Sequence, residues 1–265
     1  MTVFAFSKKA RREALRAQPT SAEWRAIVDS NVPYAALLEA DDRQDLEALM
    51  RIFLAEKRFE GCGGLAITDE MRVTIAAQAC LLLLHRQTDM YPDLETILVY
   101  PHPYRARDER RVGPVVVEGD GARLGESWTR GVVVLAWDHV NAATHPAAEG
   151  HNLVLHEFAH QLDAEDGAMD GAPPVGGRAR YVQWARVLGA EYNDLSTRLR
   201  DGRASDVDPY GSTSPAEFFA VVTEMFFERP RQLRRSHPDL YAELSTFYRQ
   251  GPAALLRRRA AQGDP

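Results

Sequence analysis

The chain has 265 residues, of which 45% are hydrophobic and 26% are charged. These proportions are those of a soluble globular protein, and they exclude a disordered or fibrous chain. The formal net charge of -6 opposes a phosphate-neutralising surface over the whole molecule, so we expect no direct nucleic-acid partner.

The cysteines and the apolar runs predict the compartment. Cys62 and Cys80 are the only cysteines, too few for the disulfide framework of a secreted protein, so we expect free thiols in a reducing compartment. The first residues, "MTVFAFSKKARRE", lack the continuous apolar segment of a secretory signal. The most apolar run, residues 74–84, has about half of the roughly 20 residues that span a bilayer. We therefore expect a cytoplasmic protein with no membrane partner.

Helical periodicity dominates the first third of the chain. It predicts two packed helices within residues 19–61, the first capped by Ser21 and the second covering residues 41–57. Thr68 then precedes "DEMRVTIAAQACLLLLHR", whose acidic first turn and basic last turn complement a helix dipole at both ends. We expect this third helix, residues 69–86, to be central to the core.

The character of the chain changes between residues 94 and 137. The segments "TILVYP", "RVGPVVVEGD" and "RGVVVLAWD" are short, rich in β-branched residues and bounded by Pro, Gly and Asp, which predicts strands. Helix resumes at about Gly150. Beyond the irregular, glycine-rich residues 167–177, the pattern predicts further helices, the last of which, "PDLYAELSTFYRQ", stops at Gly251.

These elements together predict one α+β domain over residues 1–265. We expect it to be mostly helical, with a small mixed β-sheet beside the helix that contains "HEFAH". Residues 1–18 and 252–265 are expected to be flexible tails. The sequence contains no internal repeat or clear domain linker.

Two histidines stand four residues apart in "LVLHEFAHQLDAEDG", with a glutamate beside the first. Residues at i and i+4 are neighbours on one helix face, so His156 and His160 would aim their imidazoles at a common point, as a tetrahedral zinc ion requires. Glu157 lies next to that point, where its carboxylate could take a proton from a zinc-bound water and pass it to a leaving amine. The spacing therefore predicts a zinc site with Glu157 as catalytic base.

The residues around the motif help to distinguish a metal site from two histidines that share a helix face by chance. Most neighbours of the motif are apolar, and unpaired His and Glu side chains would be costly among them, which favours a metal site. His151 is excluded as a further ligand, because about 100° per residue puts it on a different helix face. Asn152 lies one turn before His156 on the same side, where it either caps the helix or helps to shape the site, and capping is the expected role. Asp163 is either a hydrogen-bond partner of a ligand or an exposed residue of the last turn.

A catalytic zinc needs a third protein ligand. Glu217 in "STSPAEFFAVVTEMFF" is the best candidate, although Ser214, Pro215 and Glu217 also fit the N-cap, N1 and N3 positions of a capping box. Spacing alone leaves these two roles of Glu217 even. Glu224 is the rival, since it lies on nearly the same face, where a buried glutamate is either the ligand or a support for one.

Blocks longer than the five-residue motif carry a family resemblance. "VLHEFAHQLD" and, further along the chain, "YGSTSPAEFFAVVTEMFFERP" resemble the Mlc titration factor A family of bacterial zinc-dependent peptidases. "AEWRAIVDSNVPYAALL", "FEGCGGLAITDEMRVTIAAQACLLLLH" and "GVVVLAWD" are also similar to that family. The likeness covers nearly the whole chain, and only the tail after Gly251 lies outside it.

The resemblance implies a zincin-like core, similar to that of lethal-factor-type metallopeptidases. It implies zinc ligands at His156, His160 and Glu217, and so favours Glu217 over Glu224. A family tyrosine matches Tyr210, whose phenol could hydrogen-bond the oxyanion of a tetrahedral intermediate. The resemblance also implies that "GVVVLAWD" forms a sheet edge along which an extended peptide could bind.

Members of that family are weak peptidases with an aminopeptidase preference and bind the repressor Mlc. The resemblance therefore implies a gluzincin-type zinc metallopeptidase with one Zn2+ per chain, a peptide substrate and, as partner, a transcriptional repressor of sugar-uptake genes resembling Mlc. Two alternatives stay open. One is a regulator-binding protein whose zinc site is structural or vestigial, and the other is a zinc enzyme that acts on a non-peptide amide.

Overall fold

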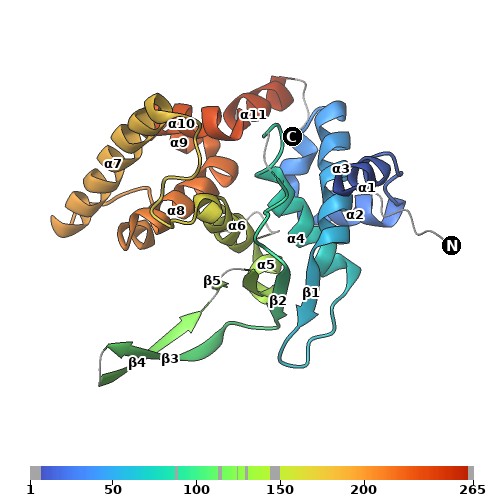
Figure 1. Cartoon of the computed structure of the whole chain (residues 1–265). Helices are drawn as coiled ribbons and strands as arrows, with labels where there is room; N and C mark the ends of the chain where they lie inside the picture. Colours follow the sequence, from blue (N-terminus) through green and yellow to red (C-terminus); the bar gives the residue numbers. More distant parts are fainter. Residues whose placement is uncertain are drawn as a thin grey trace.

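The fold is a set of helices around a small sheet. The computed structural model describes residues 7–86, 89–112, 115–123, 125–128, 131–143 and 150–261. Four strands form a sheet in the order β1-β2-β6-β5, and β3 pairs with β4 in a separate hairpin (Figure 1). The prediction of a mostly helical α+β protein with a small mixed sheet is therefore confirmed.

The two N-terminal helices that the sequence predicts to be capped both have a side-chain cap at their first turn. The Ser21 hydroxyl accepts the Trp24 N–H at the start of α2, and the Thr68 hydroxyl accepts the Met71 N–H at the start of α4. The elements of this region are α1 (Lys8–Arg16), α2 (Ala22–Asn31), the 3-10 helix η1 (Pro33–Leu37), α3 (Ala40–Glu56) and α4 (Asp69–Leu81).

Helix α4 ends at Leu81, before the predicted end at Arg86. The Leu83 N–H bonds to the Cys80 carbonyl, a tighter pattern than that of an α-helix, and His85 then takes a left-handed conformation with φ 65°. The apolar run is still buried, so its hydrophobicity reflects the core and not a continuous helix.

The four-stranded sheet is mixed. β1, β2 and β6 are parallel, and β5 pairs with β6 in the antiparallel sense. Because β6 lies between β2 and β5, the expectation that "GVVVLAWD" forms a sheet edge is wrong, and β5 occupies that edge. The strand is also shorter than predicted, since Trp137 begins a helix. The strands are β1 (Arg58–Gly61), β2 (Thr96–Tyr100), β5 (Gly125–Trp128) and β6 (Val132–Ala136).

A hairpin connects the inner sheet to its edge strand. β3 (Tyr104–Val112) and β4 (Val115–Arg123) pair antiparallel along their whole length, and β4 leads into β5. The predicted strand "RVGPVVVEGD" spans the turn of this hairpin, whose residues 113–114 lie outside the described residues. In Figure 1 the hairpin extends away from the helices.

The second half of the chain is helical. Its elements are α5 (Trp137–Ala142), α6 (Leu153–Asp163), η2 (Ala164–Asp166), α7 (Arg178–Arg200), η3 (Pro209–Ser212), α8 (Pro215–Glu228), α9 (Pro230–Ser236), α10 (Pro238–Tyr248) and α11 (Pro252–Ala261). Helix α6 packs against α8, α4 and strands β5 and β6. The helix that carries both histidines is therefore held on several sides.

Both segments predicted as flexible tails contain helices. α1 is tied to α3, because the Arg12 guanidinium makes two hydrogen bonds of 2.8 and 2.6 Å to the Glu56 carboxylate. In α11, Ala253 and Leu255 are buried in the protein interior. The structure thus differs from the expectation at residues 8–16 and 252–261, whereas residues 1–6 and 262–265 of the predicted tails lie outside the described residues.

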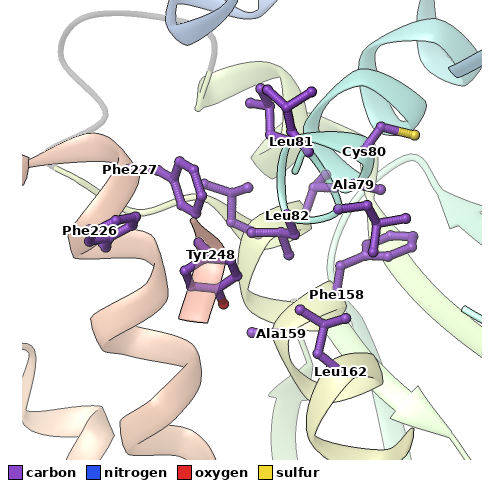
Figure 2. Close-up of a cluster of buried hydrophobic side chains, with 14 of the residues drawn as sticks. Ala79, Cys80, Leu81, Leu82, Phe158, Ala159, Leu162, Phe226, Phe227 and Tyr248 are labelled. Carbon is purple, nitrogen blue, oxygen red and sulfur yellow. The ribbon is translucent and has the colours of Figure 1, made fainter. Parts of the chain in front are cut away.

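The apolar face of α6 anchors the helix in the core. Phe158, Ala159 and Leu162 lie in one cluster with residues of α4, α8 and α10, including Leu81 and Tyr248 (Figure 2). Burial of a large apolar side chain stabilises a fold by about 1.5–3 kcal/mol. This packing fixes the backbone from which the polar residues of α6 project.

Candidate metal centre

The motif helix begins at a capped turn. The Asn152 side-chain oxygen accepts the Leu155 N–H at 3.1 Å, which confirms the expected N-cap. His156 and His160 lie one turn apart, with ring centroids separated by 4.9 Å. The helical spacing predicted from the sequence thus brings the two imidazoles together.

Helix α8 supplies the carboxylate that meets them. Ser214 caps α8 by accepting the Glu217 N–H at 3.1 Å, and Pro215 occupies the first turn. The Glu217 carboxylate does not turn back to the cap: its Oε2 lies 2.9 Å from His156 Nε2 and 3.3 Å from His160 Nε2. Of the two roles that the spacing left even, the structure places the Glu217 side chain with the histidines.

These three residues form a compact donor set. One ligand atom from each of His156, His160 and Glu217 lies within 4.8 Å of the others. Among the described residues, this is the group of histidine, cysteine and acidic side chains found close enough together to hold a metal ion. Two imidazoles and a carboxylate are the donors of many catalytic zinc sites, so the residues fit that metal.

The electrostatics of the donor set reflect mutual pairing. Burial alone would lower the pKa of His156, but hydrogen bonds to Glu217 and Glu224 raise it to about 10. Burial of Glu217 opposes ionisation, yet its hydrogen bonds to His156 and His160 hold its pKa well below the usual range. Glu217 is therefore an ionised carboxylate facing two imidazoles.

Glu157 stands beside the donor set with a different environment. The residue is only 4% exposed, and its Oε2 has no hydrogen-bond partner among the described residues. Burial raises the pKa of Glu157 to about 8, with a further contribution from the charge of Glu217. A buried carboxyl group with a raised pKa and a free oxygen is suited to accept and return a proton near pH 7.

Tyr210 lies on η3, on the exposed side of the metal centre. Its ring centroid is 6.0 Å from that of His156, and 54% of the residue is exposed. Burial of part of the ring raises the pKa of the Tyr210 phenol, and the charges of Glu217 and Glu157 raise it further. The phenol is therefore a neutral donor beside the candidate ligands.

Glu224 takes a place behind His156 and not among the three donors. Its Oε1 lies 2.7 Å from His156 Nδ1, the ring nitrogen opposite the one that faces Glu217. This arrangement matches the supporting role that the sequence left open for a buried glutamate at this position. Sequence reasoning missed Glu228, which accepts a hydrogen bond from the Asn152 side chain, because no motif signals that contact.

Asp163 is fully buried and anchors the segment that follows α6. Its carboxylate accepts the Gly171 N–H at 2.8 Å, and burial raises its pKa to about 6. The Trp184 indole donates to the Gly171 carbonyl, and Gly171, with φ 80°, lies directly against the backbone of Pro215. The exposed last-turn role for Asp163 is wrong, because the chain folds back over it to meet the start of α8.

A helix-borne His-Glu-x-x-His motif that converges with a glutamate of a second helix is the arrangement of a metallopeptidase. Comparison with known sequences agrees. The sequence profile of the family described as glucose-regulated metallo-peptidase M90 matches residues 6–249, and the chain belongs to this family.

Individual relatives cover most of the chain. An uncharacterized protein of Synechocystis is 44% identical over 90% of this chain and 87% of its own length. Mlc titration factor A of Serratia proteamaculans is 32% identical over 92% of this chain and 93% of its own. Mlc titration factor A of Yersinia enterocolitica is 30% identical over 89% and 88%, respectively. In the part of the chain that the structure describes, no helix has the length and hydrophobicity to span a bilayer.

Proposed function

We propose that this protein is a zinc-dependent peptidase of the gluzincin type, with His156, His160 and Glu217 as the zinc ligands. The observation that carries the proposal is the convergence of the three donor atoms within 4.8 Å of one another. Glu217 comes from a different helix than the histidines, so this convergence is a property of the fold and not of a local motif. Zinc bound there would supply Lewis-acid activation of the attacking water and of the scissile carbonyl.

Glu157 is the proposed general base and then general acid. It neighbours His156 in the chain, is buried, and has one carboxylate oxygen without a partner among the described residues. A carboxylate in this position takes a proton from the attacking water and delivers it to the leaving amine. Water exclusion around the buried group strengthens these electrostatic interactions.

Tyr210 is the proposed oxyanion donor. Its half-exposed ring stands beside His156 on η3, and its phenol keeps its proton because burial and nearby carboxylates raise its pKa. A neutral phenol donates a hydrogen bond to an oxygen that gains negative charge in the transition state. Asp208 accepts the Tyr210 N–H at 2.7 Å and so fixes the backbone of this turn.

The test compares wild type with Glu157→Gln. We expect Glu157→Gln to keep about one zinc per chain. Its rate of hydrolysis should fall by roughly 10²- to 10⁴-fold, because the amide cannot accept the proton. Elemental analysis measures zinc in the same preparations that are assayed on a library of fluorogenic peptides and small amides. Full hydrolysis by Glu157→Gln would contradict the proposed mechanism. Cleavage of small amides by the wild type, without cleavage of any peptide, would identify non-peptide amides as the substrate class instead.

The substrate preference is a finer proposal. The family resemblance favours an aminopeptidase-like reaction, and the library separates it by including each peptide with a free and with an acetylated amino terminus. We expect cleavage of the free form only. The proposed location is the cytoplasm, since both Cys62 and Cys80 are free thiols, as a reducing compartment requires.

The names of two relatives support a second function. Mlc titration factor A of Serratia proteamaculans and of Yersinia enterocolitica are named for Mlc. We propose that this chain binds a repressor resembling Mlc where its host has one. Binding by Glu157→Gln with wild-type affinity would show that sequestration is separate from hydrolysis, whereas no binding by the wild type would end this proposal.

A further inference from the structure

His156 is held from both sides of its ring. Glu217 faces its Nε2 at 2.9 Å, and Glu224 faces its Nδ1 at 2.7 Å. We infer that Glu224 is a positioning residue of the metal centre, which orients His156 so that Nε2 points at the metal. This inference rests on the proposed zinc site, and it gives a buried glutamate outside the donor set a defined task.

The Glu224 carboxylate is itself fixed at both oxygens. Its Oε1 accepts a hydrogen bond from His156 Nδ1 at 2.7 Å, and its Oε2 accepts the Asn152 N–H at 2.5 Å. Asn152 in turn caps α6 through Leu155 and donates from its side chain to Glu228 at 2.9 Å. Glu224 is 6% exposed, so it cannot rotate into solvent. A carboxylate held at two points restricts the imidazole that it binds.

This contact also selects the tautomer of His156. A metal-bound imidazole is neutral and has a single N–H. Because an ionised carboxylate only accepts hydrogen bonds, the contact with Glu224 would keep that proton on Nδ1. The lone pair that binds a metal is then on Nε2, the nitrogen on the Glu217 side. Ring orientation and the choice of ligating nitrogen are thus set by one side chain of α8.

The two histidines differ in this respect. His160 is buried, and its Nδ1 has no hydrogen-bond partner among the described residues. The carboxylate support is therefore concentrated on His156, although both rings meet the same Glu217 oxygen. Loss of Glu224 should consequently affect the whole centre, because His156 would lose the carboxylate that holds its Nδ1.

The test measures zinc affinity and not activity. Wild type and Glu224→Gln compete for zinc with a chromophoric chelator, and the absorption spectrum of Co2+ in the same proteins reports ligand geometry. We expect a 10- to 100-fold weaker zinc affinity in Glu224→Gln and a changed Co2+ spectrum. The amide binds the Nδ1 proton more weakly than an anion does, and it has only one acceptor oxygen for two donors.

Glu243→Gln is the matched control. Glu243 on α10 is also a 6% exposed glutamate, but its carboxylate pairs with Arg180 at 3.0 Å, away from the donor set. We expect its zinc affinity and Co2+ spectrum to equal those of wild type. If Glu224→Gln does not fold, Glu224→Asp decides, because it keeps the charge but withdraws the carboxylate from Nδ1 and should also weaken zinc binding.

Three outcomes are distinct. Weaker zinc binding in the Glu224 variant with an unchanged control supports the inference. Wild-type affinity and spectrum in a folded Glu224 variant would overturn it and leave the zinc site of the proposed function intact. A wild type that binds no zinc in this assay would overturn both, since there would be no metal centre for Glu224 to position.

Discussion

Two histidines of this protein have nearly the same immediate surroundings and different consequences. His156 lies between Glu217 at 2.9 Å and Glu224 at 2.7 Å, and His237 lies between Glu191 at 2.6 Å and Asp206 at 2.9 Å. Both rings are largely buried, and the carboxylates raise the pKa of each histidine. Contact with two carboxylates therefore does not by itself mark a metal centre.

The two histidines differ in whether a further metal-binding side chain lies close to them. A second imidazole, His160, reaches the same Glu217 oxygen because it stands one helical turn from His156. His237 follows α9 and precedes α10, and its partners tie it to α7 and to the loop before η3. Its position at a junction of helices indicates a structural ion pair. Three donor side chains at one point, and not a charged histidine, distinguish the candidate metal centre.

The largest expected effect separates the roles of His156 and His237. His156→Ala should lose both bound zinc and hydrolysis, because it removes one of the three proposed zinc ligands. His237→Ala should keep about one zinc per chain and lose stability instead. Elemental analysis and denaturant unfolding on the two variants measure both effects. Zinc loss from His237→Ala, in folded protein, would contradict the structural role.

A smaller effect is expected at Tyr210. Tyr210→Phe should lower kcat by roughly 10²-fold while zinc affinity stays unchanged, because the phenol is proposed to donate to the oxyanion and not to bind the metal. Tyr181→Phe is the control, since Tyr181 is similarly exposed but lies on α7. Steady-state kinetics on one peptide give the comparison, and an unchanged kcat in Tyr210→Phe would remove this role.

The smallest expected effect is a pH dependence of stability that comes from the ion pair of His237. Hydrogen bonds to Glu191 and Asp206 raise the pKa of His237 from 6.5 to about 9, against the opposing effect of burial. A raised pKa in the folded state means that the bridge contributes fully below about pH 6.5 and that this contribution is lost as the pH rises through about 9. At about 1.4 kcal/mol per pKa unit the shift corresponds to about 3 kcal/mol, and solvent screening of this partly exposed ion pair lowers the expected contribution to about 1–3 kcal/mol.

Denaturant unfolding at about pH 6.5 and about pH 10 measures this effect, with wild type beside His237→Gln. The free energy of unfolding of the wild type should fall with pH relative to that of His237→Gln, which lacks the titrating group. Parallel pH dependence in the two proteins would show that the bridge does not titrate as proposed.

The predictions that were correct concern interactions between residues close together in the sequence. The caps at Ser21, Thr68 and Asn152, and the pairing of His156 with His160, depend on residues within one turn, and the structure contains them all. The predicted end of α4 was wrong, because burial sustains an apolar run whether or not the helix continues. The predicted sheet edge was wrong because strand order depends on pairing with β5, a partner that no local pattern reveals.

The sequence by itself determined the motif helix, its cap and the spacing of two imidazoles, because a helix repeats every 3.6 residues whatever surrounds it. Spacing left Glu217 and Glu224 as rivals, since both project from nearly the same face of α8, and only the family resemblance favoured Glu217. Only the packing of α8 against α6 decided between them, by setting Glu217 beside Nε2 and Glu224 beside Nδ1 of His156. The register between two helices distant in the chain is a property of the shared core, which no local pattern contains.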